Sequence, residues 1–151
     1  MNPWPIALAA DLHLRPGDPE GAGRFRAWLQ EAGARARSLY LLGDLFDFWV
    51  GRGMERYPAL ADCLEALAQA PVPVHFLPGN RDFLVGPELA RATGVLLSAE
   101  ETRVPGSGAP AWLLLHGDQL CTRDRVYART RRLLRSRAVA RMAAVAPFRF
   151  Q

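Results

Sequence analysis

Short apolar runs, each followed by polar residues, recur along the chain. Runs of this kind are typical of strands that are buried on both faces of a sheet. A turn rich in proline and glycine separates the last two runs, which favours two strands there rather than one. We expect strands at residues 6–10, 39–42, 74–77, 95–104 and 111–115.

Between the apolar runs, hydrophobic residues recur every three or four positions, which predicts amphipathic helices. Phe25, Trp28 and Leu29 show this spacing, and Pro87 suits the first turn of a short helix. Strands that alternate with helices favour an α/β fold, in which ligands gather at the carboxyl ends of the strands. We expect helices at residues 20–37, around 60–67, at 87–93 and from 124 to Pro147.

The composition is that of a globular protein. Of the 151 residues, 50% are hydrophobic and 23% are charged, which excludes a disordered chain. No apolar run approaches the roughly 20 residues that span a bilayer, and the first residues do not form a secretory signal. Cys63 and Cys121 lack CxxC spacing, so we expect small buried thiols in a reducing compartment. These features predict a cytoplasmic protein.

Four of the expected strands end at side chains that can bind a metal ion. A set of carboxylate, imidazole and amide oxygen suits a borderline divalent ion such as Mn²⁺ or Zn²⁺ better than Ca²⁺. An aspartate between two such ions can bridge them, and a pair of ions roughly 3.5–4 Å apart clamps the oxygens of a displacement at phosphorus. The candidate ligands are Asp11 and His13, Asp44, Asn80 and His116, with Asp44 as the natural bridge.

Each of these motifs also has a simpler interpretation. Asp11 could cap a loop, Gly43-Asp44 and Gly117-Asp118 are common turn dipeptides, and Asn80 could tolerate a positive φ. We expect all four strands to belong to the same sheet, and the coincidence of these motifs at their ends favours a shared site. His75 lies inside an expected strand, so we expect it to pack in the core.

The motifs match a known family in order and spacing. The chain resembles the calcineurin-like metallophosphoesterases, which implies an α-β-β-α sandwich and the hydrolysis of phosphate esters or anhydrides. The resemblance rests on Asp11-Leu12-His13, Gly43-Asp44-Leu45-Phe46-Asp47, Gly79-Asn80-Arg81-Asp82 and His116-Gly117-Asp118.

One position narrows the resemblance further. Most of the superfamily has a histidine where this chain has Arg81, and Arg81-Asp82-Phe83-Leu84 is similar to the UDP-2,3-diacylglucosamine pyrophosphohydrolases of lipid A synthesis. Residues 43–49 and 116–122 are similar to the same subfamily. This resemblance implies a two-metal hydrolase, with Mn²⁺ as the first choice, that releases UMP and 2,3-diacylglucosamine 1-phosphate.

The resemblance also implies a role for each candidate residue. One ion takes Asp11 and His13, the other takes Asn80 and His116, and Asp44 bridges them. A guanidinium cannot deliver a proton near neutral pH, but it can stabilise developing negative charge. The expected catalytic residues are Asp44, Asn80, Arg81 and His116, and the expected substrate contacts are Asn80, Arg81, Asp124 and Tyr127.

The charge of the chain is concentrated in its last part. All 19 basic residues are arginines; residues 1–117 contain 10 of them against 13 acids, whereas residues 118–151 contain 9 against two. A basic helix can be a solvated face or a nucleic-acid surface, but no aromatic platform accompanies this one. The resemblance favours a catalytic core at 1–122 and the start of a helical lid at 123–151. Such a lid suits a lipid substrate and peripheral binding to the cytoplasmic face of the inner membrane, with no nucleic acid partner.

The family pattern continues with a late Gly-His-x-His, but no histidine follows His116. We therefore expect a truncated core that binds metal weakly and turns over slowly. Three hypotheses follow: the lipid A pyrophosphohydrolase, a metallophosphoesterase of other specificity such as a nuclease or phosphatase, and a non-catalytic remnant.

Overall fold

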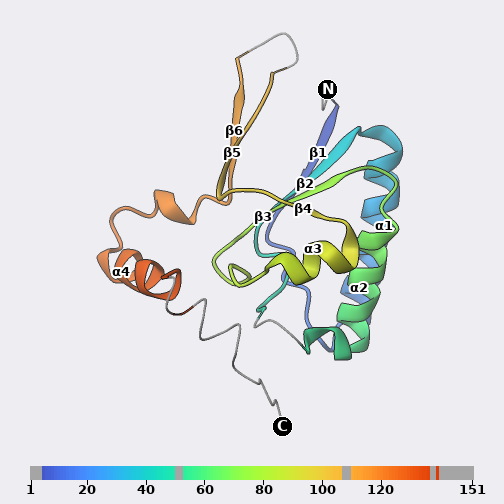
Figure 1. The fold of residues 1–151 in the computed structure, drawn as a ribbon, viewed down its shortest axis with the longest axis horizontal. Coiled ribbons are helices and arrows are strands. Elements are labelled where there is room, and N and C mark those ends of the chain that lie inside the picture. Colours follow the sequence, from blue (N-terminus) through green and yellow to red (C-terminus); the bar gives the residue numbers. More distant parts are fainter. Residues whose placement is uncertain (1–4, 50–52, 107–109, 137–138, 140–151) are drawn as a thin grey trace.

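A parallel sheet forms the centre of the chain (Figure 1). The computed structural model describes residues 5–49, 53–106, 110–136 and 139. The sheet order is β1-β2-β3-β4, and every neighbouring pair is parallel. Its carboxyl ends therefore meet along one edge, as the alternating pattern predicts. The strands are β1 (Ile6–Ala9), β2 (Ser38–Leu42), β3 (Val74–Leu77) and β4 (Leu96–Leu97).

Helices connect these strands and cover one face of the sheet (Figure 1). Asp18 caps the first helix by accepting a 2.8 Å hydrogen bond from the Gly21 N–H, and Pro19 occupies its first turn. The third helix is capped at its carboxyl end by Gly94, whose φ of 74° suits glycine. The helices are α1 (Pro19–Arg35), α2 (Pro58–Ala68), α3 (Pro87–Thr93) and α4 (Arg125–Leu134), with short 3₁₀ turns η1 (Met54–Arg56) and η2 (Asp118–Leu120).

A hairpin of β5 (Glu101–Val104) and β6 (Trp112–Leu115) forms a second, antiparallel sheet. Val104 and Leu114 pack with Tyr40 and Leu77 in a small core that is separate from the main core beneath the helices. Since Tyr40 and Leu77 belong to β2 and β3, both faces of these two inner strands are covered, whereas β4 is exposed. This explains why the two inner strands lack an alternating polar face.

Two predictions about the strands were wrong. Residues 95–104 do not form one strand: after β4, the Ser98 N–H donates to the Phe76 carbonyl, and the chain then leaves the sheet edge before β5 begins. The run at 111–115 does not join the parallel sheet, because it pairs with β5 instead. Apolar runs predict strands, but they carry no information about which partner a strand takes.

Two predictions about the carboxyl-terminal part also need correction. The helix from Asp124 ends at Leu134, where the Arg135 N–H bonds back to the Arg131 and Leu133 carbonyls. Most of the remaining stretch to Pro147 lies outside the described residues. Cys63 is buried as expected, but Cys121 is exposed because it follows η2 at the surface. Both thiols are free. In the part of the chain that the structure describes, no helix could cross a bilayer.

Candidate metal centre

The five predicted ligands lie together. Asp11 and His13 follow β1, Asp44 follows β2, Asn80 follows β3, and His116 follows β6. The first four reach the same edge because their strands are parallel neighbours. His116 arrives from the second sheet, yet its Nδ1 lies 2.8 Å from the carbonyl oxygen of Leu42, the last residue of β2. The structure therefore brings the five side chains together, although one of them comes from a different sheet.

Two glycines allow the ligand loops to approach one another. A Cβ on Gly79 would lie 2.1 Å from Asp44 Oδ1, and a Cβ on Gly43 would lie 2.5 Å from the Gly79 Cα and 2.9 Å from His116 Nδ1. Gly43 also has a φ of 86°, which side chains rarely adopt. Gly43 and Gly79, which stand beside the candidate ligands Asp44 and Asn80, are therefore required by the space between the loops.

Asp44 lies between two pairs of candidate ligands. Its Oδ2 is 4.0 Å from His13 Nε2, which in turn is 3.9 Å from Asp11 Oδ1. Its Oδ1 is 3.8 Å from His116 Nε2, which is 3.0 Å from Asn80 Oδ1. Each carboxylate oxygen therefore faces a different pair, which is the arrangement that a bridging ligand needs.

The donor atoms fit divalent cations. Because a backbone carbonyl only accepts, His116 Nδ1 donates to Leu42 and presents the Nε2 lone pair to Asn80 Oδ1. Two acceptors that face each other are stabilised by a cation bound to both. Asp11, His13 and Asp44 likewise offer ligand atoms that all lie within 4.8 Å of one another. The residues present are thus suited to hold metal on both sides of Asp44.

The backbone at the site is strained. Asp11, His13 and Asp44 have φ values of 56°, 50° and 53°, a region that residues with a side chain seldom occupy. Main-chain hydrogen bonds between the two loops stabilise this strained conformation. The Asp11 N–H donates to the Gly43 carbonyl, and the His13 N–H donates to the Asp44 carbonyl. Strain of this kind clusters at functional sites. Asn80, for which the sequence suggested a positive φ as an alternative, does not belong to this set.

Asp82 is a site residue to which the sequence assigned no role. Its side chain is fully buried, and it accepts hydrogen bonds from four backbone N–H groups, those of Gly79, Asp44, Leu45 and Phe46. Burial raises the pKa of the Asp82 carboxyl, and the backbone N–H groups act in the opposite direction. Asp82 therefore ties the loop that carries Asn80 to the loop that carries Asp44.

Asp47 is a second residue that the sequence did not single out. Its Oδ1 accepts a 2.7 Å bond from Arg81 Nη1 and lies 3.6 Å from His13 Nδ1, and its Oδ2 lies 3.1 Å from Arg15 Nε. Arg81 is half-exposed, and its Nε lies 3.7 Å from Asp44 Oδ2. The guanidinium is thus held over the ligands while it remains open to solvent. The motif Gly-Asp-x-x-Asp was the only signal for Asp47 in the sequence.

The structure places Asp124 and Tyr127 at the start of α4. Asp124 caps the helix by accepting a 2.8 Å bond from the Tyr127 N–H, and the Tyr127 hydroxyl donates to Asp118 at 2.7 Å. Burial and the bond to Asp118 raise the pKa of Tyr127 to about 12. Burial alone would raise the pKa of Asp118, but bonds from Arg131 and Tyr127 lower it overall. Contact of Asp124 and Tyr127 with a substrate stays a prediction.

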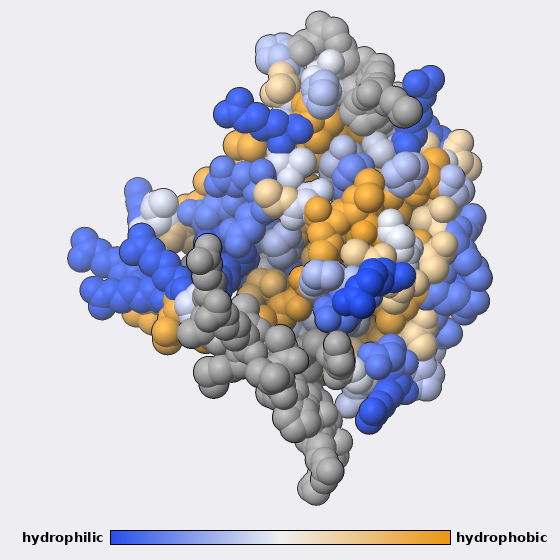
Figure 2. All heavy atoms as spheres, viewed as in Figure 1, coloured by the Kyte–Doolittle hydropathy of each residue, from blue (hydrophilic) through white to orange (hydrophobic). Residues whose placement is uncertain are grey.

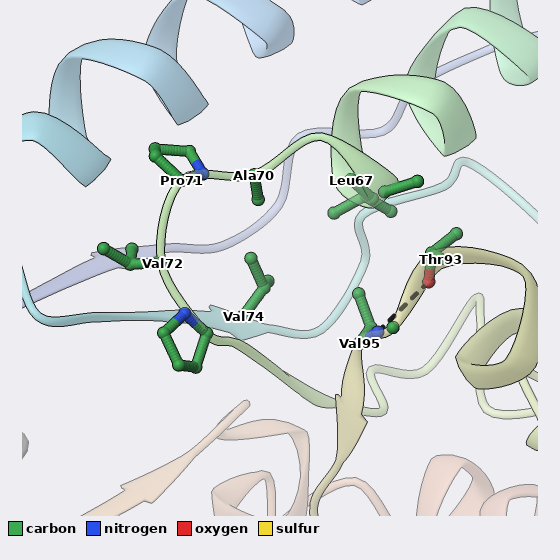
Figure 3. A pocket seen from close by; sticks show the side chains of 10 residues that line it. Leu67, Ala70, Pro71, Val72, Val74, Thr93 and Val95 are labelled. Carbon is green, nitrogen blue, oxygen red and sulfur yellow. Dashed lines mark hydrogen bonds between the residues drawn. The ribbon is translucent and has the colours of Figure 1, made fainter.

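The third histidine and a cavity lie away from these residues. His75 stacks on Tyr40 with ring centroids 4.4 Å apart, and burial lowers its pKa, as expected for a packed residue. A cavity of about 350 Å³ lies between the end of α2 and the residues that precede β3 and β4 (Figure 3). Val74 and Val95, which line it, mark the amino ends of these strands. The cavity is therefore at the opposite end of the sheet from the candidate metal centre.

The fold and the paired ligands together define a class of protein. Residues 5–138 match the model of the calcineurin-like phosphoesterase family, and the chain belongs to that family. Its members are metallophosphoesterases, so the family implies divalent metal at the site that the structure shows. This confirms the family resemblance noted in the sequence.

The chain is also similar to curated proteins that share one name. UDP-2,3-diacylglucosamine hydrolase from Proteus mirabilis is 39% identical over 140 residues, which cover 91% of this chain and 58% of the relative. The enzyme of the same name from Serratia proteamaculans is 39% identical over 144 residues, which cover 94% of this chain and 60% of the relative. The chain thus spans three fifths or less of the length of these curated relatives.

A solved structure supports the fold alone. A protein of unknown function from Aquifex aeolicus superposes with a TM-score of 0.54 at 15% identity, over 85% of this chain and 70% of that one.

Proposed function

We propose that this chain is part of a two-metal hydrolase that cleaves the diphosphate bond of UDP-2,3-diacylglucosamine, releasing UMP and 2,3-diacylglucosamine 1-phosphate. The observation that carries the proposal is the position of Asp44, whose two oxygens face His13 at 4.0 Å and His116 at 3.8 Å. The names of the relatives supply the substrate. The family resemblance implies that this reaction is a step of lipid A synthesis.

The five ligands divide into two sets. Asp11 and His13 would hold one ion, Asn80 and His116 would hold the other, and Asp44 would touch both. Bound divalent ions, with Mn²⁺ as the first choice, would polarise the phosphoryl oxygens and lower the pKa of water at the site. The contribution of the chain is geometric: the Leu42 carbonyl fixes the His116 ring, and Asp82 fixes the backbone on which Asp44 lies.

Arg81 suits the recognition of a diphosphate. Asp47 holds one nitrogen of its guanidinium at 2.7 Å, which leaves other N–H donors for the substrate. An arginine presents a planar set of donors to phosphate oxygens and stabilises charge that develops there. Arg81 and Asn80 would contact the phosphates of the substrate and stabilise the charge that develops there. Asp124 and Tyr127, at the start of α4, would also contact the substrate.

The outer face of α4 suits a lipid substrate at a membrane surface. Val126 is 76% exposed and Leu133, seven residues later on the same face, is 67% exposed. Arginines flank this apolar strip, and Figure 2 shows hydrophilic side chains gathered over the region of α4. A helix with apolar and cationic positions side by side binds at the interface of anionic lipids. We therefore propose that residues 123–151 begin a basic lid and that the protein lies at the cytoplasmic face of the inner membrane.

The activity is tested by the release of UMP from UDP-2,3-diacylglucosamine in detergent micelles with Mn²⁺. Asp44→Asn should abolish Mn²⁺-dependent release, because it removes the charge between the two ligand pairs. Asp62→Asn, which neutralises an exposed carboxylate on α2, is the matched control and should leave release unchanged.

Three other outcomes would overturn parts of the proposal. Hydrolysis of nucleic acid or of a simple phosphomonoester without UMP release would indicate a metallophosphoesterase of other specificity. Mn²⁺ binding by titration calorimetry without any hydrolysis would indicate a non-catalytic protein. Release of UMP that survives Asp44→Asn would refute the assigned site.

A further inference from the structure

Arg135, just past the end of α4, reaches back to the loop that carries a candidate ligand. Its side chain is only 11% exposed, although it belongs to the most basic part of the chain. Its Nη2 donates a 2.7 Å hydrogen bond to the carbonyl of Gly79, and Gly79 precedes Asn80. Arg135 therefore connects α4 to Asn80 across 56 residues of sequence.

The hydrogen bonds hold Asn80 from both sides. The Gly79 carbonyl belongs to the peptide unit that precedes Asn80, and Arg135 fixes it. The Arg81 N–H belongs to the peptide unit that follows, and it donates to Asp44 Oδ1 at 2.9 Å. The Gly79 N–H is fixed in turn by the buried Asp82. Because Arg135 donates to this carbonyl, the loss of its side chain would free the preceding peptide to rotate.

The guanidinium is itself held in place. One nitrogen pairs with Glu100, and another lies 3.5 Å from Asp118 Oδ2. The guanidinium carbon lies 5.6 Å from the centroid of the Phe83 ring. Arg131, one turn earlier on α4, bonds the same two carboxylates. A side chain fixed by several partners loses little further entropy when it orients another group, which suits a positioning role.

We propose that Arg135 is a positioning residue for Asn80, which it holds toward His116 through the Gly79 carbonyl. This inference rests on the proposed function in one respect, since it takes Asn80 and His116 as ligands of one ion. Arg135 touches neither the ion nor the substrate. Its contribution is to keep Asn80 Oδ1 at the 3.0 Å separation from His116 Nε2 that the structure shows.

The effect on metal affinity follows from the chemistry of outer ligands. Groups that orient a metal ligand typically change affinity by 10–100-fold when they are removed. We expect Arg135→Ala to weaken Mn²⁺ binding by about 10-fold, and Arg135→Lys to recover part of the loss, since an ammonium can donate to the Gly79 carbonyl. Arg132→Ala removes the same charge from an exposed position on the same helix and should bind Mn²⁺ as the unaltered chain does.

A second measurement does not depend on metal. Hydrogen exchange of the Arg81 amide in the metal-free chain reports whether the segment around Asn80 is held. Arg135→Ala should accelerate exchange of this amide by several-fold more than that of amides within β2 and β3, whereas Arg132→Ala should not. An equal acceleration everywhere would mean that Arg135 only stabilises the fold, and would overturn the proposal.

The two readouts separate this inference from the proposed function. If Asn80→Ala leaves Mn²⁺ binding unchanged, the proposed metal site is wrong, and the exchange of the Arg81 amide still decides whether Arg135 orders this loop. If Asn80→Ala weakens Mn²⁺ binding but Arg135→Ala behaves like Arg132→Ala in both measurements, the positioning role alone is refuted. Should Arg135→Ala fail to fold, the comparison of Arg135→Lys with Arg132→Ala provides the same decision.

Discussion

Asp82 joins the two loops that carry Asp44 and Asn80, and the variant Asp82→Asn tests how much that junction contributes. The change keeps the size and shape of the side chain. It replaces one of the two acceptor oxygens by an NH₂ group, which can only donate. Because the side chain is fully buried, water cannot compensate for a lost partner.

The magnitude follows from the four N–H groups around the carboxylate. Oδ1 accepts from Gly79 at 2.9 Å and from Asp44 at 3.2 Å, and Oδ2 accepts from Leu45 at 2.8 Å and from Phe46 at 3.4 Å. An asparagine can satisfy one pair, so two buried donors lose their acceptor. Each such loss costs about 1–3 kcal/mol, which predicts a decrease of about 2–6 kcal/mol in the free energy of unfolding.

Urea unfolding followed by tryptophan fluorescence measures this decrease, because the chain contains four tryptophans. Asp62→Asn is the matched control, since it removes the same charge from an exposed position on α2. We expect the control to lie within about 0.5 kcal/mol of the unaltered chain. We also expect Asp82→Asn to weaken Mn²⁺ binding, since the Asp44 backbone loses an anchor.

A decrease below about 1 kcal/mol for Asp82→Asn, relative to Asp62→Asn, would refute the reasoning. It would mean that the loops find other acceptors, or that the carboxyl is already protonated and makes fewer acceptor contacts than the geometry indicates. Burial raises the pKa of this carboxyl, so the measurement should be made at neutral pH and repeated at pH 8. Equal decreases at both values would exclude protonation as the explanation.

Three further predictions concern the site, the thiols and α4. Gly79→Ala should abolish Mn²⁺ binding and lower the free energy of unfolding by about 1–3 kcal/mol, because the added Cβ would lie 2.1 Å from Asp44 Oδ1. The control Gly17→Ala, which has open space around it, should do neither. Calorimetry and urea unfolding measure the two effects, and a Gly79→Ala variant that binds Mn²⁺ normally would contradict the prediction. A maleimide at pH 8 should label the exposed Cys121 and spare Cys63, as mass spectrometry would show. Burial raises the pKa of Cys63 from an ordinary 9.0 to about 12, so the unfolded state loses this proton first. The stability that the thiol contributes is therefore intact below pH 9.0 and is lost as the pH rises toward about 12. Cys63→Ala should lack this dependence on pH. Asp124→Ala should cost about 1 kcal/mol of helix stability, visible as faster amide exchange in α4, whereas Asp124→Asn should retain the cap.

Much of the site could be predicted because its information is local. A candidate metal ligand that follows an apolar run can be recognised without knowledge of the rest of the chain. This applies to Asp11, His13, Asp44, Asn80 and His116, and the last three also stand beside a glycine. The parallel sheet then brings the ends of neighbouring strands together. Helices were predictable for the same reason: α3 begins at Pro87 and ends at Thr93 as expected.

The residues that the sequence did not reveal act through distant partners. Asp82 and Asp47 stand in two of the quoted motifs, but the motifs do not say what either carboxylate contacts. Arg135 lies in a run of arginines that composition alone assigns to solvent. Only the packing of the loops buries Asp82 against four N–H groups and brings Arg135 to the Gly79 carbonyl. Burial and long-range hydrogen bonds depend on which elements pack together, and the sequence does not show this. It also does not show that the strand before His116 pairs with β5 instead of joining the parallel sheet.

The sequence by itself therefore determined the candidate ligands, their order and the apolar runs that they follow, because side-chain chemistry and hydrophobic period are properties of each segment. The tertiary structure decided that Asp44 lies between two ligand pairs and that α4 is tied to the Asn80 loop. These arrangements bring together residues that are up to 74 positions apart in the sequence. They depend on the packing of the two sheets and on the space that Gly43 and Gly79 leave open.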